Sequence, residues 1–109
     1  MNLPTPPEPT LAKEKLKKDL EKENEYALPH PRLTVVRLTK ANIKQGTWIA
    51  SYLWTQCGWK DTLKRYGISW QKFVEAVRDN YYSFLSWIEG KKSWEETIKD
   101  LIAIIERKM

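Results

Sequence analysis

Apolar residues recur at helical spacing along most of the second half of the chain. The longest run extends from Ser69 to Ile88, where apolar side chains fall at positions i, i+3, i+4 and i+7. This spacing gathers them into a sector of roughly 120° on a helical wheel, which is the face that a core-facing helix buries. We therefore predict one long helix over residues 69–88.

Four other segments also have helical patterns. Thr10 can cap a helix that ends near Glu25 and has only a narrow apolar stripe. Residues 47–58 are apolar nearly all round, which is typical of a central, buried helix. Residues 59–66 predict a short basic helix that Gly67 ends, and residues 93–96 (Ser-Trp-Glu-Glu) form a capping box that opens a final helix.

The remaining segments set the predicted boundaries of the domain. Residues 1–9 contain four prolines, which exclude a helix interior and favour an extended arm that lies on the domain or reaches toward a partner. Residues 32–38 have the β-branched content of a short strand, and pairing across a homodimer would satisfy its backbone. We predict a mainly α fold, a small helical domain of four to five helices with room for one short N-terminal strand. Residues 1–31 form the proline-rich arm and charged helix, and residues 32–109 form the helical core domain.

The net charge of +5 comes from one part of the chain. Residues 32–79 hold nine basic residues against three acidic ones, whereas the flanking helices are balanced. A local excess of cations is typical of a partner that bears phosphates. The alternative is that these lysines only keep a small domain soluble.

The junction between residues 59 and 78 resembles a helix-turn-helix. A short helix ends at Gly67, the apolar Ile68 follows, and Ser69 caps a second helix. Phe73 also suits that pattern, whereas Leu63 stands where a small residue is usual. The resemblance implies DNA binding and transcription regulation, with an outward face on the second helix and phosphate contacts from neighbouring segments. The implied nucleic-acid-binding residues are Lys40, Lys44, Lys60, Lys64, Arg65, Gln71, Lys72 and Arg78.

Residues 67–78 also resemble the second helix of ribbon-helix-helix repressors. In that family a strand similar to residues 34–38 enters the major groove from a dimer. Here 28 residues separate Leu38 from Gly67, which is more than the one short helix that the family has there. Neither likeness covers more than about half of the chain.

A protein-interaction module or accessory subunit is the alternative function. Tyr82 and Trp87 lie outside the apolar sector of the long helix, and Trp54 lies opposite the apolar residues of its own helix. Exposed Trp and Tyr are common anchors of protein interfaces. The competing interpretation is that a second layer of helices buries these three side chains.

The sequence contains no motif of an enzyme, metal site or cofactor site. Cys57 is the only cysteine and His30 the only histidine, so neither a disulfide nor a cysteine-rich zinc site can form within the chain. No uncharged stretch approaches the roughly 20 residues that span a bilayer. We therefore expect a non-enzymatic, cytoplasmic protein with no cofactor, no small-molecule substrate and no membrane contact.

Overall fold

The computed structural model describes residues 1–26 and 40–109, and side chains within residues 1–18 and 45–109. These residues form six α-helices and one π-helical turn, with no strand among them. The mainly α fold class is confirmed, although the helices exceed the predicted four to five. The strand predicted over residues 32–38 lies outside the described residues. No described helix has both the length and the apolarity needed to cross a membrane.

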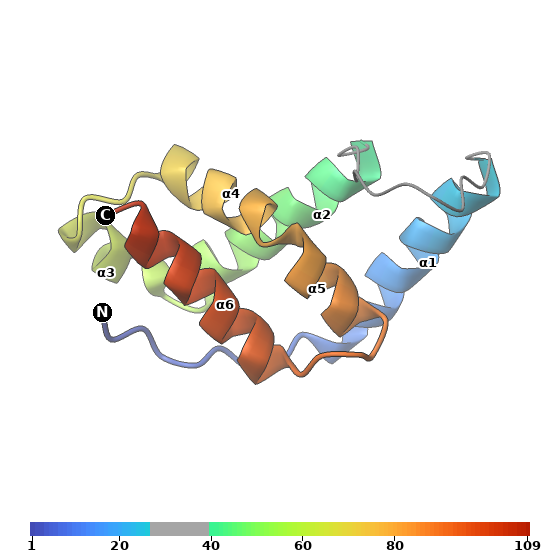
Figure 1. Cartoon of the computed structure of the whole chain (residues 1–109), viewed down its shortest axis with the longest axis horizontal. Helices are drawn as coiled ribbons and strands as arrows, with labels where there is room; N and C mark the ends of the chain where they lie inside the picture. Colours follow the sequence, from blue (N-terminus) through green and yellow to red (C-terminus); the bar gives the residue numbers. More distant parts are fainter. Residues whose placement is uncertain (27–39) are drawn as a thin grey trace.

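The helices pack in two layers around one core (Figure 1). In chain order they are α1 (Thr10–Tyr26), α2 (Lys40–Ser51), the π-helical turn η1 (Tyr52–Gln56), α3 (Trp59–Arg65), α4 (Trp70–Asp79), α5 (Tyr81–Ile88) and α6 (Trp94–Arg107). α2 packs on α4 and α1 packs on α5, while α6 lies against both α4 and α5. α3 packs mainly on η1, at one end of the molecule.

A π-helical turn interrupts residues 47–58, whose apolar side chains are buried in part, since Trp48 is 38% exposed. We predicted one regular helix there, but α2 ends at Ser51, and the Cys57 N–H donates to the Tyr52 carbonyl five residues earlier (3.1 Å). The wider turn rotates the side chains that follow it. Leu53 and Trp54 are therefore both buried, with 0% and 8% of their surface exposed.

The prediction of one continuous helix over residues 69–88 is wrong, because Asn80 divides this segment into α4 and α5. Asn80 is buried and leaves helical geometry (φ −90°, ψ 13°). Its Nδ2 donates across the domain to the Thr97 carbonyl in α6 (3.2 Å). Asparagine favours such side-chain bonds to backbone over the helix interior. Most of the predicted apolar face is buried, including Phe73, Val77 and Phe84, whereas Trp70 at its start is 39% exposed.

The proline-rich arm lies on the domain. It runs along one edge of the molecule, from the end that carries α3 and the C-terminus to the start of α1 (Figure 1). Met1 and Leu3 pack against the core, and Pro6 is buried. Aromatic side chains of η1, α3, α5 and α6 hydrogen-bond the arm between Pro4 and Glu8. The first nine residues therefore help to bury side chains that lie far away in the sequence.

Candidate nucleic-acid interface

Three of the predicted phosphate contacts project from α3 into solvent. Lys60, Lys64 and Arg65 are exposed, whereas Trp59 and Leu63 on the opposite face are fully buried. Because α3 has seven residues, it is only about 10 Å long. The three cations are therefore held close together at one end of the molecule.

The turn after α3 brings the start of α4 to the same end. Gly67 has φ +76°, and its N–H bonds the Lys64 carbonyl (3.0 Å) while the Ile68 N–H bonds the Leu63 carbonyl (2.9 Å). These two bonds form a Schellman motif, whose left-handed residue favours glycine. The Ser69 hydroxyl then accepts from the Lys72 N–H (3.2 Å) and caps α4. The helix end and the helix start that the sequence predicted here are confirmed.

The first turn of α4 adds one more cation and an amide to this end. Gln71 and Lys72 are exposed. No carboxylate within the described residues forms an ion pair with Lys60, Lys64, Arg65 or Lys72. Asp61 and Glu75 are also exposed on the same helices, so four cations stand against two anions there.

Two aromatic rings that sequence reasoning did not assign to a site lie among these cations. Tyr66 is 47% exposed and Trp70 is 39% exposed. Trp70 falls within the apolar sector of residues 69–88, which predicts a core position, but it is the first residue of α4 and stays partly exposed while its ring contacts Trp54 (5.4 Å between centroids) and Phe73 (6.3 Å). Its position beside the Ser69 cap is the sequence signal for this placement, because a residue in the first turn projects past the end of the packed face.

No described interaction places the other predicted nucleic-acid-binding residues on this surface. Arg78 is half-buried, its Cγ lies 3.7 Å from where a Cβ on Gly46 would stand, and its Nε is buried with no hydrogen-bond partner among the described residues. The Arg78 side chain therefore lies over α2. Lys40 and Lys44 belong to α2, but their side chains lie outside the described residues.

The three side chains predicted to anchor a protein partner are placed differently from one another. Tyr82 is 58% exposed. Trp54 and Trp87 are 8% and 0% exposed, so the expectation that they lie on the surface is wrong. Trp54 packs on Phe73 and Trp70 because the π-helical turn rotates it inward. Trp87 is covered by the arm, whose Glu8 accepts a hydrogen bond from its Nε1 (2.8 Å).

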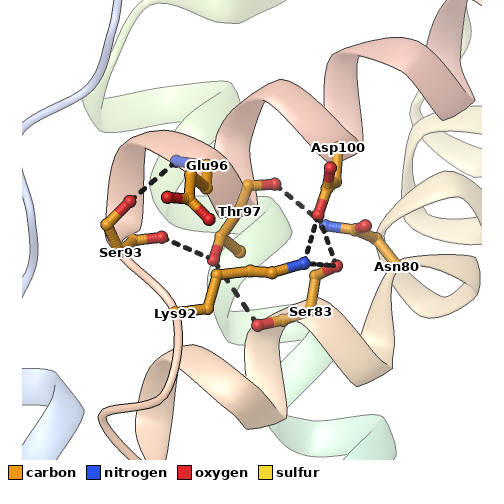
Figure 2. Close-up of polar contacts among 7 residues, drawn as sticks. All are labelled: Asn80, Ser83, Lys92, Ser93, Glu96, Thr97 and Asp100. Carbon is orange, nitrogen blue, oxygen red and sulfur yellow. Dashed lines mark hydrogen bonds and ion pairs between the residues drawn. The ribbon is translucent and has the colours of Figure 1, made fainter.

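A pocket of about 260 Å³ lies between α5 and α6 at the other end of α4. Beside it is a polar cluster formed by Ser83, Lys92 and Asp100, shown in Figure 2. The Ser83 hydroxyl donates to Asp100 Oδ2 (2.8 Å), and Lys92 Nζ lies 2.6 Å from the same oxygen and 3.3 Å from Ser83 Oγ. Both contacts hold the pKa of the Asp100 carboxyl below its usual value, with Lys92 as the larger cause.

This cluster fits a structural cross-link better than a nucleophile. A serine nucleophile needs a base that accepts its proton. Here the ammonium of Lys92 donates to Ser83, and the Asp100 carboxylate that accepts from Ser83 is neutralised by the same ammonium. The bonds tie α5 to the loop before α6, and the Ser93 cap on the Glu96 N–H (3.1 Å) fixes the start of α6 next to it.

Cys57 is half-buried, and burial raises the pKa of its thiol. It is therefore protonated at neutral pH and is a poor nucleophile. Within residues 1–18 and 45–109, no three His, Cys, Asp or Glu side chains gather as metal ligands. His30 lies outside the described residues.

Comparisons with protein-family models, with curated proteins and with solved structures found no match to this chain. Function is therefore inferred from the chain's own residues.

Proposed function

We propose that the protein is a non-enzymatic DNA-binding protein that contacts DNA through one surface at the α3 end of the molecule. This α3–α4 surface consists of Lys60, Lys64, Arg65, Tyr66, Trp70, Gln71 and Lys72. The observation that supports the proposal is that its four cations have no carboxylate partner within the described residues and share α3, the turn after it and the first turn of α4 with two half-exposed aromatic rings.

The cations supply the affinity in this proposal. Each Lys or Arg that neutralises a phosphate releases condensed counterions, which makes binding favourable at low salt and weaker as salt rises. A cation already paired with a carboxylate contributes less, because the pair must first be broken. Lys91, Lys92 and Lys108 are paired in this way with Glu89, Asp100 and Asp79. The cations of the α3–α4 surface are not.

The rings and the amide supply the mode of binding. If α4 enters a major groove as in a helix-turn-helix, Gln71 and Lys72 at its start reach base edges, while Glu75 one turn later faces away from phosphates. If the strand is single, Tyr66 and Trp70 stack on bases between phosphate contacts. Binding to duplex and to single-stranded DNA of one sequence distinguishes the two modes.

The test compares two variants that each remove three positive charges. One carries Lys60→Gln, Lys64→Gln and Arg65→Gln on α3. The matched control carries Lys91→Gln, Lys99→Gln and Arg107→Gln, which lie in α6 and the loop before it and outside the α3–α4 surface. All six side chains are exposed, so both variants should stay folded.

The DNA-binding constant of each variant is measured by fluorescence anisotropy with labelled DNA, at salt concentrations from about 50 to 200 mM. The α3 variant should bind more weakly, and the slope of log K against log salt should decrease by about 2.7 for duplex DNA, since each phosphate contact contributes about 0.9. The control should keep most of the slope. Absence of binding at micromolar protein and 50 mM salt, or an equal loss in both variants, would overturn the proposal.

A further inference from the structure

The arm is held by four aromatic side chains that donate hydrogen bonds to it. Trp59 Nε1 donates to the Pro4 carbonyl (3.1 Å) and Trp94 Nε1 to the Pro6 carbonyl (2.7 Å). The Tyr52 hydroxyl donates to the Pro7 carbonyl (2.7 Å). Trp87 Nε1 donates to the Glu8 carboxylate (2.8 Å). We call these four side chains, Tyr52, Trp59, Trp87 and Trp94, the arm site.

The chemistry of the arm site suits a segment rich in proline. All three backbone carbonyls that it bonds belong to prolines, which lack an N–H and so present only an acceptor. An indole or phenol offers a flat apolar ring together with one donor, which matches a pyrrolidine ring followed by its carbonyl. Pro6 is buried against the domain.

The site also recognises a carboxylate that follows the prolines. The oxygen of Glu8 that accepts from Trp87 lies 3.7 Å from Lys13 Nζ. The Lys13 ammonium is in turn 5.3 Å from the centroid of the Trp87 ring. A carboxylate at this position gains a charge-assisted contact as well as the indole bond. The pattern that the site reads is therefore Pro-x-Pro-Pro followed by an acidic residue.

The four donors come from separate elements, so the arm site is built by the tertiary fold. They lie in η1, α3, α5 and α6, and they are 45 to 88 residues away from the arm positions that they bond. Trp59, Trp87 and Trp94 are buried, and a buried N–H without a partner is destabilising. Whatever covers these rings must therefore supply acceptors at the same places.

We propose that the arm site is a recognition site for proline-rich segments of a partner protein, and that residues 1–9 fill it as an internal ligand. The arm has no helix or strand of its own, so a proline-rich segment can replace it without unfolding a helix. Every bond that the arm makes can then be made again by the incoming prolines. The arm thus competes with the partner and sets the concentration at which the partner binds.

The competition has a defined scale. A ligand tethered by a short segment acts at an effective concentration in the millimolar range. A free peptide identical to the arm should therefore displace half of the arm at roughly millimolar concentration, whatever the intrinsic affinity of the site. A partner with more contacts should bind at lower concentration.

The first test uses the unchanged full chain. An unlabelled peptide of residues 1–10 is added to 15N-labelled protein, and the amide signals of Thr5 and Glu8 are followed by NMR. We expect them to move to free-peptide positions at roughly millimolar peptide, while the indole N–H signals of Trp59 and Trp94 stay hydrogen-bonded. A control peptide with Pro4→Ala, Pro6→Ala and Pro7→Ala should have no effect. Unmoved arm signals at saturating peptide would overturn the proposal.

The second test separates the arm from the site. Pro6→Gly with Pro7→Gly in the full chain weakens the arm only, so the apparent affinity for the peptide should increase by about tenfold or more. Tyr52→Phe removes one donor from the site, which weakens arm and peptide equally and should leave the apparent affinity unchanged in the otherwise natural chain. Combined with the arm change, Tyr52→Phe should reduce peptide affinity several-fold.

Two results of the second test would contradict the proposal. One is an arm variant that is folded by circular dichroism and binds the peptide no better than the unchanged chain. The other is that the unchanged chain forms a dimer whose population rises with protein concentration and does not fall when peptide is added. The arm site would then bind the arm of a second copy and not a partner's proline-rich segment.

Discussion

The molecule has two groups of aromatic side chains that differ in what covers them. The arm site buries Trp59, Trp87 and Trp94, and their N–H groups bond the arm. On the α3–α4 surface, Tyr66 and Trp70 are 47% and 39% exposed, and their side chains form no hydrogen bond within the described residues. Residue type therefore does not separate the two groups. The two groups differ in whether the arm places a hydrogen-bond acceptor, a carbonyl or the Glu8 carboxylate, beside the ring.

This difference indicates which aromatic residues the arm already occupies and which a ligand can reach without displacing the arm. A tryptophan whose polar atom is bonded inside the molecule contributes to stability through both burial and the hydrogen bond. One that lies at a helix start among unpaired cations contributes less to stability. The predictions below test this division, from the largest expected effect to the smallest.

Replacing one tryptophan from each group tests whether the covered ring contributes more to the free energy of unfolding than the exposed ring. Trp87→Ala should lower the free energy of unfolding by about 3–5 kcal/mol, because it removes a fully buried ring and leaves a cavity. Trp70→Ala should lower the free energy of unfolding by less than about 1 kcal/mol, because the Trp70 ring is only partly covered and contacts Trp54 in part. Urea denaturation followed by circular dichroism measures both. Equal losses would show that exposure does not distinguish these residues.

The exposed group should matter for binding instead. Trp70→Ala should weaken binding of single-stranded DNA by about 1–3 kcal/mol, the usual contribution of one base stacked on an aromatic ring. Tyr82→Ala is the control, since Tyr82 is more exposed but lies in α5, beyond the end of α4 and outside the α3–α4 surface. Anisotropy titrations compare the two variants. A loss in the Tyr82 variant as large as in the Trp70 variant would contradict the division.

Asn80 lies where α4 ends and α5 begins. Asn80→Ala should lower the free energy of unfolding by about 1–2 kcal/mol, because it removes the buried bond to the Thr97 carbonyl. A more helical, straighter junction would partly offset this loss. Thermal unfolding measures the sum. A stabilised variant would show that the helical break, and not the hydrogen bond, determines the energy at this position.

Local signals in the sequence predicted several elements correctly. Gly67, Ser69 and Ser93 mark helix ends through bonds that span three or four residues, so their effects can be read from nearby sequence. The helices that start at Trp59 and Trp94 follow from the same kind of signal.

Features that depend on distant residues could not be predicted in the same way. The break at Asn80 depends on a carbonyl 17 residues away, and the burial of Trp87 depends on Glu8, which is 79 residues away. A helical wheel contains neither contact, and so it placed Trp87 outside the apolar face. The wheel also assumed regular geometry through residues 52–56, where the π-helical turn rotates Trp54 inward.

The smallest expected effect concerns charges and not rings. Asp100 is paired with Lys92 but is 44% exposed at its side chain, so Asp100→Asn should lower the free energy of unfolding by less than about 1 kcal/mol at pH 7. Because its folded pKa is lowered, Asp100 stabilises the fold above the usual carboxyl pKa of about 3.9, and this is lost as pH falls through the lowered value. Unfolding at pH 7 and pH 3 checks the sign, since the difference between natural chain and variant should shrink in acid.

The hydrogen bond from Trp94 to Pro6 joins positions 88 residues apart, and so it determines when the fold is completed during synthesis. The arm leaves the ribosome before all of its donors, and Trp94, the last of them, is made 88 residues after Pro6. Helices between the two can form earlier from local contacts. Until α6 emerges, the arm lacks its bond to Trp94, so Tyr52, Trp59 and Trp87 are less firmly covered and more open to chaperones and to aggregation.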